Sequence, residues 1–582
     1  MKKMKRWLGL SLMAVFAFII SVSSVACRGG ANGGIKIDPN RTQLYVSSHA
    51  GGFGSDWLTA ASARFEEYYK DTSFESGKTG VQIIPDTPKT IGTGLLADIK
   101  NNRNNVIFTE SVYYYDYIAA GAMADITDIV SGENSDLTEY GDNGGNIEGK
   151  LTEQQIAYYK TSDNKYYGVP HYAAFMGIMY DVDLFDEKMF YFADNENNGN
   201  DGFIIRANDK RSAGPDGKYC EVCAANGYDY SNHVCDDGLP ATYDEFVKLC
   251  DYIAGAGVTP LIWSGENHAD VFGKFMAQLA ADFEGDEYAL NFSFSGEATH
   301  LVDSIDADGT VHYKPATQIT NANGYELYSS AGRYYAIDFV EKILSKSTYH
   351  HDFVFNVTHS HMDAQDDFLY SKDEDKRIAM LIDGNWWENE ADSTFADMSN
   401  GNPNDPNSRQ SRRIGYMPLP KATEEQVGEG ETLTDFLYSM GFINVNSCDT
   451  PVKLDLAKKF LKFVNSQQSL EEFTVLTSSP KSLEYEMSDE SLAKMTYFGK
   501  SMWNTRESAN VVYPYSTNSL YLNHQSDFVF QSGFQSKLNN QIVTDISKKI
   551  NDEHISAKEV FEGIIAYRTA EQWAANYASE IN

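Results

Sequence analysis

Short apolar runs alternate with helical segments beyond residue 40, and this alternation constrains the fold more than any other feature. Leu44–Ser47, Val81–Ile84 and Val106–Phe108 are short runs typical of buried strands. Apolar residues at helical spacing fill the intervening segments 56–69 and 91–99. Strand, helix, strand, helix, strand predicts an α/β sheet with parallel strands. A ligand would then bind beyond the carboxyl ends of these strands.

The first 27 residues have the pattern of a secretory signal peptide. The basic segment Lys2–Arg6 precedes the apolar run Leu8–Ile20, which is shorter than the ~20 residues that a membrane span needs. Cys27 follows small residues in a pattern that resembles a bacterial lipobox, with Ser24 where Leu is usual. We therefore expect a lipid anchor on Cys27, the alternative being a plain secreted protein with an incidental cysteine. The Gly-rich residues 28–40 are expected to form a flexible tether.

Length and charge narrow the classes of function. The chain of 582 residues, even without its signal, is too long for one ordinary domain of roughly 150 residues. The net charge of −36 would repel a phosphate backbone, so we expect no nucleic-acid partner. The 37 Tyr and 7 Trp residues permit a carbohydrate site without requiring one, because each ring joins an apolar face to a polar handle.

The second part of the sequence contains the same kinds of elements. Further strands are predicted at Gly177–Tyr180, Thr259–Trp263, Ile378–Trp387 and Gly441–Val445, and an amphipathic helix at Ala457–Val464. Another helix is predicted to begin after Thr242, with Thr242 as N-cap and Glu245 at the capping-box position.

The order of these segments resembles the family 1 extracellular solute-binding proteins of carbohydrate ABC importers. The matching segments are VIFTES, MADITDIV, KYYGVPHYAAFMGIMYDVDLFDE, LPATYDEF, RIAMLIDGNWWENE, RRIGYMPLPK and AKKFLKFVNSQQSLEEF, which follow the family order from about residue 41 to 485. The resemblance implies an α/β, type II periplasmic-binding-protein-like fold, in which hinge crossovers join two lobes around a central ligand cleft.

The resemblance also implies how the chain is divided between the lobes. Residues 41–168 would begin lobe one, and residues 169–437 would form lobe two, with an insertion at about 190–239. Residues 438–485 would return to lobe one. Residues 486–582 would form C-terminal helices of lobe two.

The function implied by the resemblance is capture of an extracellular carbohydrate, expected to be an oligosaccharide, and its delivery to ABC permease subunits. No catalysis and no cofactor are required, and a monomer on the extracellular face of the bacterial cytoplasmic membrane is expected. Two alternatives stay open. A glycoside hydrolase would need two carboxylates ~5–10 Å apart, and a binding protein for another solute would take a peptide or an anion.

The candidate ligand contacts lie at predicted strand ends or at the supposed crossovers. They are Gly52, Phe53, Trp57, Glu110, His171, Tyr172, Trp263, Asp383, Asn385, Trp386 and Tyr438. Glycine lets the backbone approach a ligand, aromatic planes can cover sugar faces, and carboxylates and amides can bond hydroxyls. Of the pair Trp386 and Trp387 we expect one ring in the core and Trp386 in the cleft. Core packing is the alternative for Trp263.

The insertion contains two patterns that suggest metal sites. A structural zinc site is one interpretation of Cys220, Cys223, His233 and Cys235, with one disulfide or free thiols as alternatives. A calcium loop is one interpretation of Asp194, Glu196, Asn198 and Asn200, with a solvated acidic loop as the alternative. Ile205 occupies the position where a calcium loop has its closing acid.

Overall fold

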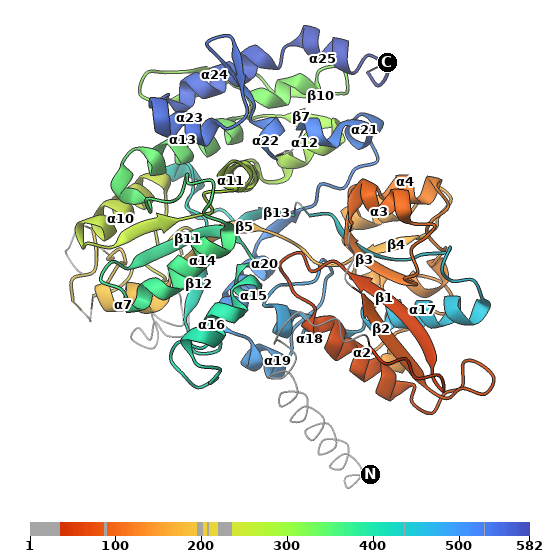
Figure 1. The fold of residues 1–582 in the computed structure, drawn as a ribbon. Coiled ribbons are helices and arrows are strands. Elements are labelled where there is room, and N and C mark those ends of the chain that lie inside the picture. Colours follow the sequence, from red (N-terminus) through yellow and green to blue (C-terminus); the bar gives the residue numbers. More distant parts are fainter. Residues whose placement is uncertain are drawn as a thin grey trace.

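Two β-sheets, each flanked by helices, form the centres of two lobes that lie side by side (Figure 1). The computed structural model describes residues 35–86, 90–194, 202–206, 209–218, 236–435, 437–528 and 530–581. This mixed α/β architecture confirms the predicted fold class. Within those residues, no helix combines the length and the apolar character that crossing a membrane would demand.

Lobe one is built on a five-stranded sheet of order β2-β1-β3-β14-β4. Its strands are β1 (Thr42–Ser48), β2 (Val81–Asp86), β3 (Val106–Glu110), β4 (Gly168–Pro170) and β14 (Ser439–Ile443). The first three strands pair in parallel, and β14 runs antiparallel to β3 and β4. The carboxyl ends of β1 and β3 therefore meet at one edge of the sheet, as predicted.

The helices of lobe one follow the predicted alternation with the strands. They are α2 (Asp56–Tyr68), α3 (Gly92–Asp98), α4 (Tyr114–Ala119), α5 (Thr127–Val130), α6 (Glu153–Tyr159), α17 (Pro451–Phe463) and α18 (Gln467–Thr477). Helix α18 packs against α2, so the segment after β14 belongs to lobe one. Ser55 is the N-cap of α2, but its side chain makes no capping hydrogen bond.

Lobe two is built on a four-stranded sheet of order β12-β5-β11-β6. Its strands are β5 (Met176–Asp181), β6 (Thr259–Ile262), β11 (Ile378–Gly384) and β12 (Ile414–Met417). Strands β6 and β11 are parallel neighbours, whereas β5 runs antiparallel to β11 and β12. The flanking helices are α7 (Val182–Lys188), α10 (Tyr243–Gly255), α11 (His268–Glu284), α13 (Ala331–Leu344), α14 (His361–Tyr370), α15 (Trp387–Glu390), α16 (Asp392–Met398) and α20 (Tyr497–Ser508). The short helix α12 (Leu290–Ser293) lies nearer the C-terminal helices (Figure 1), and α19 (Asp489–Lys494) contacts α18 of lobe one.

Helix α10 begins as the sequence predicted, with one difference at its cap. The Thr242 hydroxyl accepts a hydrogen bond from the Glu245 amide at 3.3 Å. The Glu245 carboxylate, however, accepts from the Ala241 amide at 2.7 Å rather than from the amide of Thr242. The reciprocal half of the predicted capping box therefore lies one residue earlier.

The C-terminal helices lie over lobe two, at the top of Figure 1. They are α21 (Ser519–Phe528), α22 (Phe530–Gly533), α23 (Ile546–Glu553), α24 (Ala557–Tyr567) and α25 (Ala570–Asn576). Helices α22, α23 and α24 pack on α11 and α13. Four two-stranded sheets complete the described structure: β7 (Gly296–Ala298) with β10 (Thr317–Ile319), β8 (Val302–Ile305) with β9 (Val311–Tyr313), β13 (Thr432–Thr434) with β15 (Asn510–Val512), and β16 (Ser536–Leu538) with β17 (Gln541–Val543).

A buried ion cluster fixes the end of β5. One carboxylate oxygen of Asp181 lies 2.9 Å from the Arg377 guanidinium and 3.1 Å from that of Arg412. The other oxygen accepts from the Leu184 amide at 3.1 Å and so caps α7. The side chains of Asp181 and Arg412 are almost completely buried. The Asp181 carboxylate therefore joins β5 and α7 to the two segments that carry Arg377 and Arg412.

Three chain segments cross between the lobes and contact one another. The first follows β4, the second precedes β14, and the third follows α18. The His171 amide donates to the Ser439 carbonyl at 2.9 Å, and the Ser482 amide donates to the His171 carbonyl at 3.1 Å. Tyr172 and Lys481 form an antiparallel bridge between the first and third crossovers. Main-chain hydrogen bonds thus join all three at residue 171.

Candidate ligand-binding site

The loop after β1 contacts lobe two directly. Gly52 has a φ of +81°, and a Cβ at this position would lie 2.7 Å from atoms of the Trp386 side chain. The Phe53 ring lies 6.4 Å from the Trp386 ring at a near-perpendicular angle, and 4.3 Å from the Tyr172 ring. The absence of a side chain at Gly52 is what lets the loop of lobe one approach the indole of lobe two.

Glu110 provides a carboxylate next to these rings, at the end of β3. The Tyr172 hydroxyl donates to its Oε1 at 2.6 Å, and His49 Nε2 lies 3.8 Å from its Oε2. Burial raises the pKa of Glu110, while the tyrosine hydrogen bond and the positive charges of His49 and Lys274 oppose this rise. We use the name interlobe site for Gly52, Phe53, Glu110, Tyr172 and Trp386. Phe53 and Tyr172 are themselves buried, so the accessible groups of the site are the Glu110 carboxylate and the Trp386 indole, which suit a hydroxyl-bearing ligand.

We expect Gly52→Ala to separate the lobes, because its Cβ would collide with Trp386. Gly54→Ala is the matched control, since Gly54 also has a positive φ, of +73°, but a Cβ there would meet nothing within 4 Å. Both variants should lose ~1–2 kcal/mol of folding stability through backbone strain. Small-angle scattering should show a larger radius of gyration for Gly52→Ala alone. Equal scattering by the two variants would contradict this role of Gly52.

The adjacent tryptophans at the end of β11 have the two environments expected from the sequence. Trp387 is fully buried and packs against the rings of Phe395 and Phe498. Trp386 is half-buried, and the Lys274 ammonium lies 5.9 Å from its ring centre. Trp387 therefore belongs to the core, while Trp386 lies where the lobes meet.

Two other predicted aromatic contacts are core residues. Trp263 is fully buried against Phe272, His350 and Phe355. A ring without a free face cannot stack on a sugar. The predicted stacking role of Trp263 was therefore wrong, and Trp263 is a core residue. Trp57 is likewise buried, with its ring against Phe108, His171 and Phe473.

Asn385 and Asp383 are buried and engaged in internal hydrogen bonds. The Asn385 side chain accepts from the Phe175 amide and donates to the Ala173 carbonyl, both at 3.2 Å, and so braces the first crossover. Asp383 accepts from Gln365 Nε2 at 2.9 Å and from the Gly384 amide at 2.7 Å. Burial, with the negative charge of Glu390, raises the pKa of Asp383 to about 7. Both residues support the interlobe site from within lobe two.

Tyr438 and His171 lie inside the crossovers. Tyr438 is buried with a φ of +51°, and its hydroxyl bonds that of Tyr521. His171 is buried, and its Nδ1 lies 2.9 Å from Lys481 Nζ. Burial together with the charge of Lys481 lowers the pKa of His171 well below its usual range. These two predicted contacts therefore form part of the hinge in this structure.

Lys481 gives the folding stability a defined pH dependence. Burial lowers its pKa from 10.5 to about 7, so between these values the unfolded chain binds a proton that the folded chain lacks. Its contribution to stability should rise with pH across this window, by up to ~1.4 kcal/mol per pH unit, and be smallest below pH 7. We expect Lys481→Met to stabilise the protein most near neutral pH. Urea denaturation from about pH 7 to about pH 9.5 should show the gain shrinking, and a constant gain would contradict the assignment.

Sequence reasoning missed a polar cluster beside Trp386. Its members are Lys274 on α11, His361 and Gln365 on α14, and Glu390 at the end of α15. Only Glu390 had a local signal, because it lies four residues after Trp386, in the segment NWWENE. The others reach this place through the packing of α11 and α14 around β11, which no local pattern reveals.

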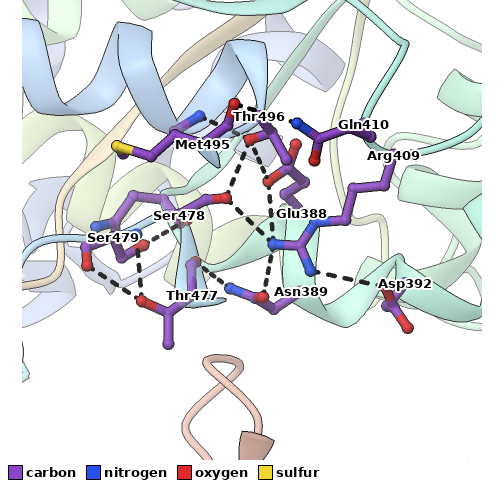
Figure 2. A network of polar contacts seen from close by, with 12 residues as sticks. Glu388, Asn389, Asp392, Arg409, Gln410, Thr477, Ser478, Ser479, Met495 and Thr496 are labelled. Carbon is purple, nitrogen blue, oxygen red and sulfur yellow. Dashed lines mark hydrogen bonds and ion pairs between the residues drawn. The ribbon is translucent and has the colours of Figure 1, made fainter. Parts of the chain in front are cut away.

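A polar network connects the helix after Trp386 to the third crossover (Figure 2). Arg409 Nη2 donates to Asn389 Oδ1 at 2.8 Å, to Glu388 Oε2 at 3.1 Å and to Ser478 Oγ at 3.2 Å. The Thr496 hydroxyl donates to the same Glu388 oxygen at 3.0 Å. Because Glu388 is almost completely buried, this network holds α15 firmly against the end of α18.

The predicted metal sites and the lipid attachment point lie mainly outside the described residues. Cys27, Cys220, Cys223, His233 and Cys235 are outside them, as are Glu196, Asn198 and Asn200. Asp194 is described and is buried. Among the described side chains, no group of three or more His, Cys, Asp or Glu residues is arranged to hold a metal ion.

Comparison with known proteins supports the architecture. No family model matches the sequence, and neither does any curated protein. The structure of maltose-bound T. maritima MalE3 is similar, with a TM-score of 0.50 and 14% identity, over 90% of this chain and 99% of that chain. A structure from work on xylan utilization by the thermophilic bacterium Caldanaerobius polysaccharolyticus has a TM-score of 0.51 and 12% identity, over 90% of this chain and 99% of that chain. The chain therefore shares the two-lobed α/β fold of these two structures.

Proposed function

We propose that this protein binds an extracellular carbohydrate, an oligosaccharide, between its lobes and delivers it to an ABC-type permease. One observation carries the proposal: the indole of Trp386 from lobe two meets the Gly52 loop of lobe one beside Glu110 and Tyr172. These groups provide one aromatic face and several hydrogen-bonding atoms where lobe one meets lobe two. The structural relatives include proteins described with maltose and with xylan utilization.

Binding would work through differential affinity for two arrangements of the lobes. A ligand that contacts Glu110 on one lobe and Trp386 on the other is bound more tightly when the lobes are together, so it shifts the population toward that state. The closed form would then be the one that the permease recognises. No covalent step is required, so we propose a binding protein rather than an enzyme.

The proposed location follows from the first residues of the chain. A diacylated Cys27 would hold the protein at the extracellular face of the bacterial cytoplasmic membrane. The Gly-rich tether would allow the lobes to reach the permease subunits. We propose that the protein acts there as a monomer, with no nucleic-acid partner and no required cofactor.

A thermal-shift panel of mono- and oligosaccharides, followed by calorimetry, tests this function. A sugar at 100 times its dissociation constant should stabilise the wild type by ~2.7 kcal/mol. We expect Trp386→Ala to weaken binding about tenfold, because a ligand that covers about 60 Å² of the apolar indole face gains ~1.5 kcal/mol from its burial.

Tyr313→Ala is the control, since this exposed tyrosine lies on β9, away from the interlobe site. It should bind the sugar as the wild type does. The proposal fails if no sugar in the panel stabilises the wild type, or if oligosaccharides are hydrolysed at a catalytic rate.

A further inference from the structure

Two carboxylates of lobe two share one amide nitrogen. Gln365 Nε2 donates to Asp383 Oδ2 at 2.9 Å and to Glu390 Oε2 at 2.8 Å. Gln365 has no exposed surface, so this nitrogen holds the two acids in a fixed relation. Two like charges that share one donor each oppose ionisation of the other. Burial and the charge of Glu390 accordingly raise the pKa of Asp383 to about 7.

Glu390 is the accessible member of this pair. Its side chain keeps 19% of its surface exposed, and its Oε1 lies 3.7 Å from His361 Nε2. Asp383, by contrast, is almost completely buried behind it. A ligand can therefore reach Glu390, while Asp383 and Gln365 fix its position.

Glu390 lies beside Trp386, the lobe two member of the interlobe site. Its amide donates to the Trp386 carbonyl at 3.3 Å, so the two residues lie one helical turn apart. Lys274 lies near the Trp386 ring, on the lobe two side of the interlobe site. Burial raises the pKa of Glu390, as it does that of Glu110, and the positive charge of Lys274 opposes both rises.

We propose that Glu390 is a specificity-determining residue that accepts hydrogen bonds from the hydroxyls of an uncharged sugar and excludes sugars carrying a carboxylate. This inference rests on the proposed function. Hydroxyls are donors, and a carboxylate binds them through charge-assisted hydrogen bonds. A uronic acid would instead bring a further negative charge to a site that already holds the carboxylates of Glu110 and Glu390.

The titratable groups facing Glu390 come from three neighbouring elements. Helix α14 provides His361, α11 provides Lys274, and the end of β11 provides Asp383. The Lys274 ammonium forms an ion pair with Asp270 of the same helix at 2.8 Å, and this carboxylate partly neutralises its positive charge. The cluster therefore favours a neutral ligand over an anionic one.

The test compares a neutral oligosaccharide that binds the wild type with its analogue in which one hydroxymethyl group is oxidised to a carboxylate. Calorimetry should show the wild type binding the neutral sugar at least tenfold more tightly. Glu390→Gln should lose at least tenfold for the neutral sugar and reduce the discrimination between the two. Glu390→Asp, which keeps the charge, should retain the discrimination.

Glu287→Gln is the matched control, because Glu287 is also a partly exposed carboxylate of lobe two facing a histidine, His300 at 3.5 Å. It should bind both sugars as the wild type does. Wild-type affinity for the neutral sugar in Glu390→Gln, or equal wild-type affinity for the two sugars, would overturn the role of Glu390 alone. Failure of the wild type to bind any sugar would overturn the proposed function as well.

Discussion

Replacing Trp387 by alanine is expected to cost ~3–5 kcal/mol of folding stability, the usual range for a buried tryptophan. Its ring is fully buried between Phe368, Phe395 and Phe498, so removal leaves a cavity in the core of lobe two. Urea denaturation followed by far-UV circular dichroism would measure the loss.

The neighbouring residue supplies the control. Trp386→Ala removes a ring of the same size from a half-buried position and should cost much less stability, while it weakens sugar binding. The pair thus separates a residue that maintains the core from one that contacts the ligand. Equal losses of stability in the two variants would show that the assignment of core and site is mistaken.

Asp181→Ala should also destabilise the protein by ~3–5 kcal/mol, because it removes the anion from a buried ion cluster. Arg377 and Arg412 would keep their charges without this carboxylate, and α7 would lose its N-cap. Most of the loss therefore reflects charges left buried rather than the strength of the original pair. The midpoint of urea denaturation should fall accordingly.

Asp183→Ala is the appropriate comparison. Asp183 pairs with Arg413, but both side chains are more than one-third exposed, so solvent screens the interaction. Exposed pairs of this kind contribute about 0–1 kcal/mol. If Asp183→Ala were as damaging as Asp181→Ala, burial would not be the cause of the larger effect.

The sequence predicted the elements of the fold because each depends on local patterns. The alternation from Leu44 to Phe108 gave β1, β2 and β3 with α2 and α3 between them. Because these strands run parallel, their carboxyl ends lie at one edge of the sheet. The Gly52 loop and Glu110 follow two of these ends, which is why both were predicted at the site. The burial of Trp387 agrees with the prediction that one ring of the Trp386–Trp387 pair lies in the core, whereas ligand contact by Trp386 stays a prediction.

The errors came from contacts between distant segments. Trp263 follows a strand end as Trp386 does, but the loop that carries His350 and Phe355 covers its ring. No residue near Trp263 in the sequence predicts that its ring is covered, because the covering loop lies almost a hundred residues later. Gln365 was missed for the same reason, since its two carboxylate partners meet it only once α14 packs beside β11.

The three crossovers have a consequence for how the lobes move. Main-chain hydrogen bonds join the crossover segments to one another at His171, Ser439 and Ser482, so we expect little sliding of one lobe past the other. The expected motion of the two lobes is hinge bending at the three crossovers. Each closure of the lobes would then bring Glu110 and Trp386 to the same relative position, so that every ligand meets the same arrangement of binding groups.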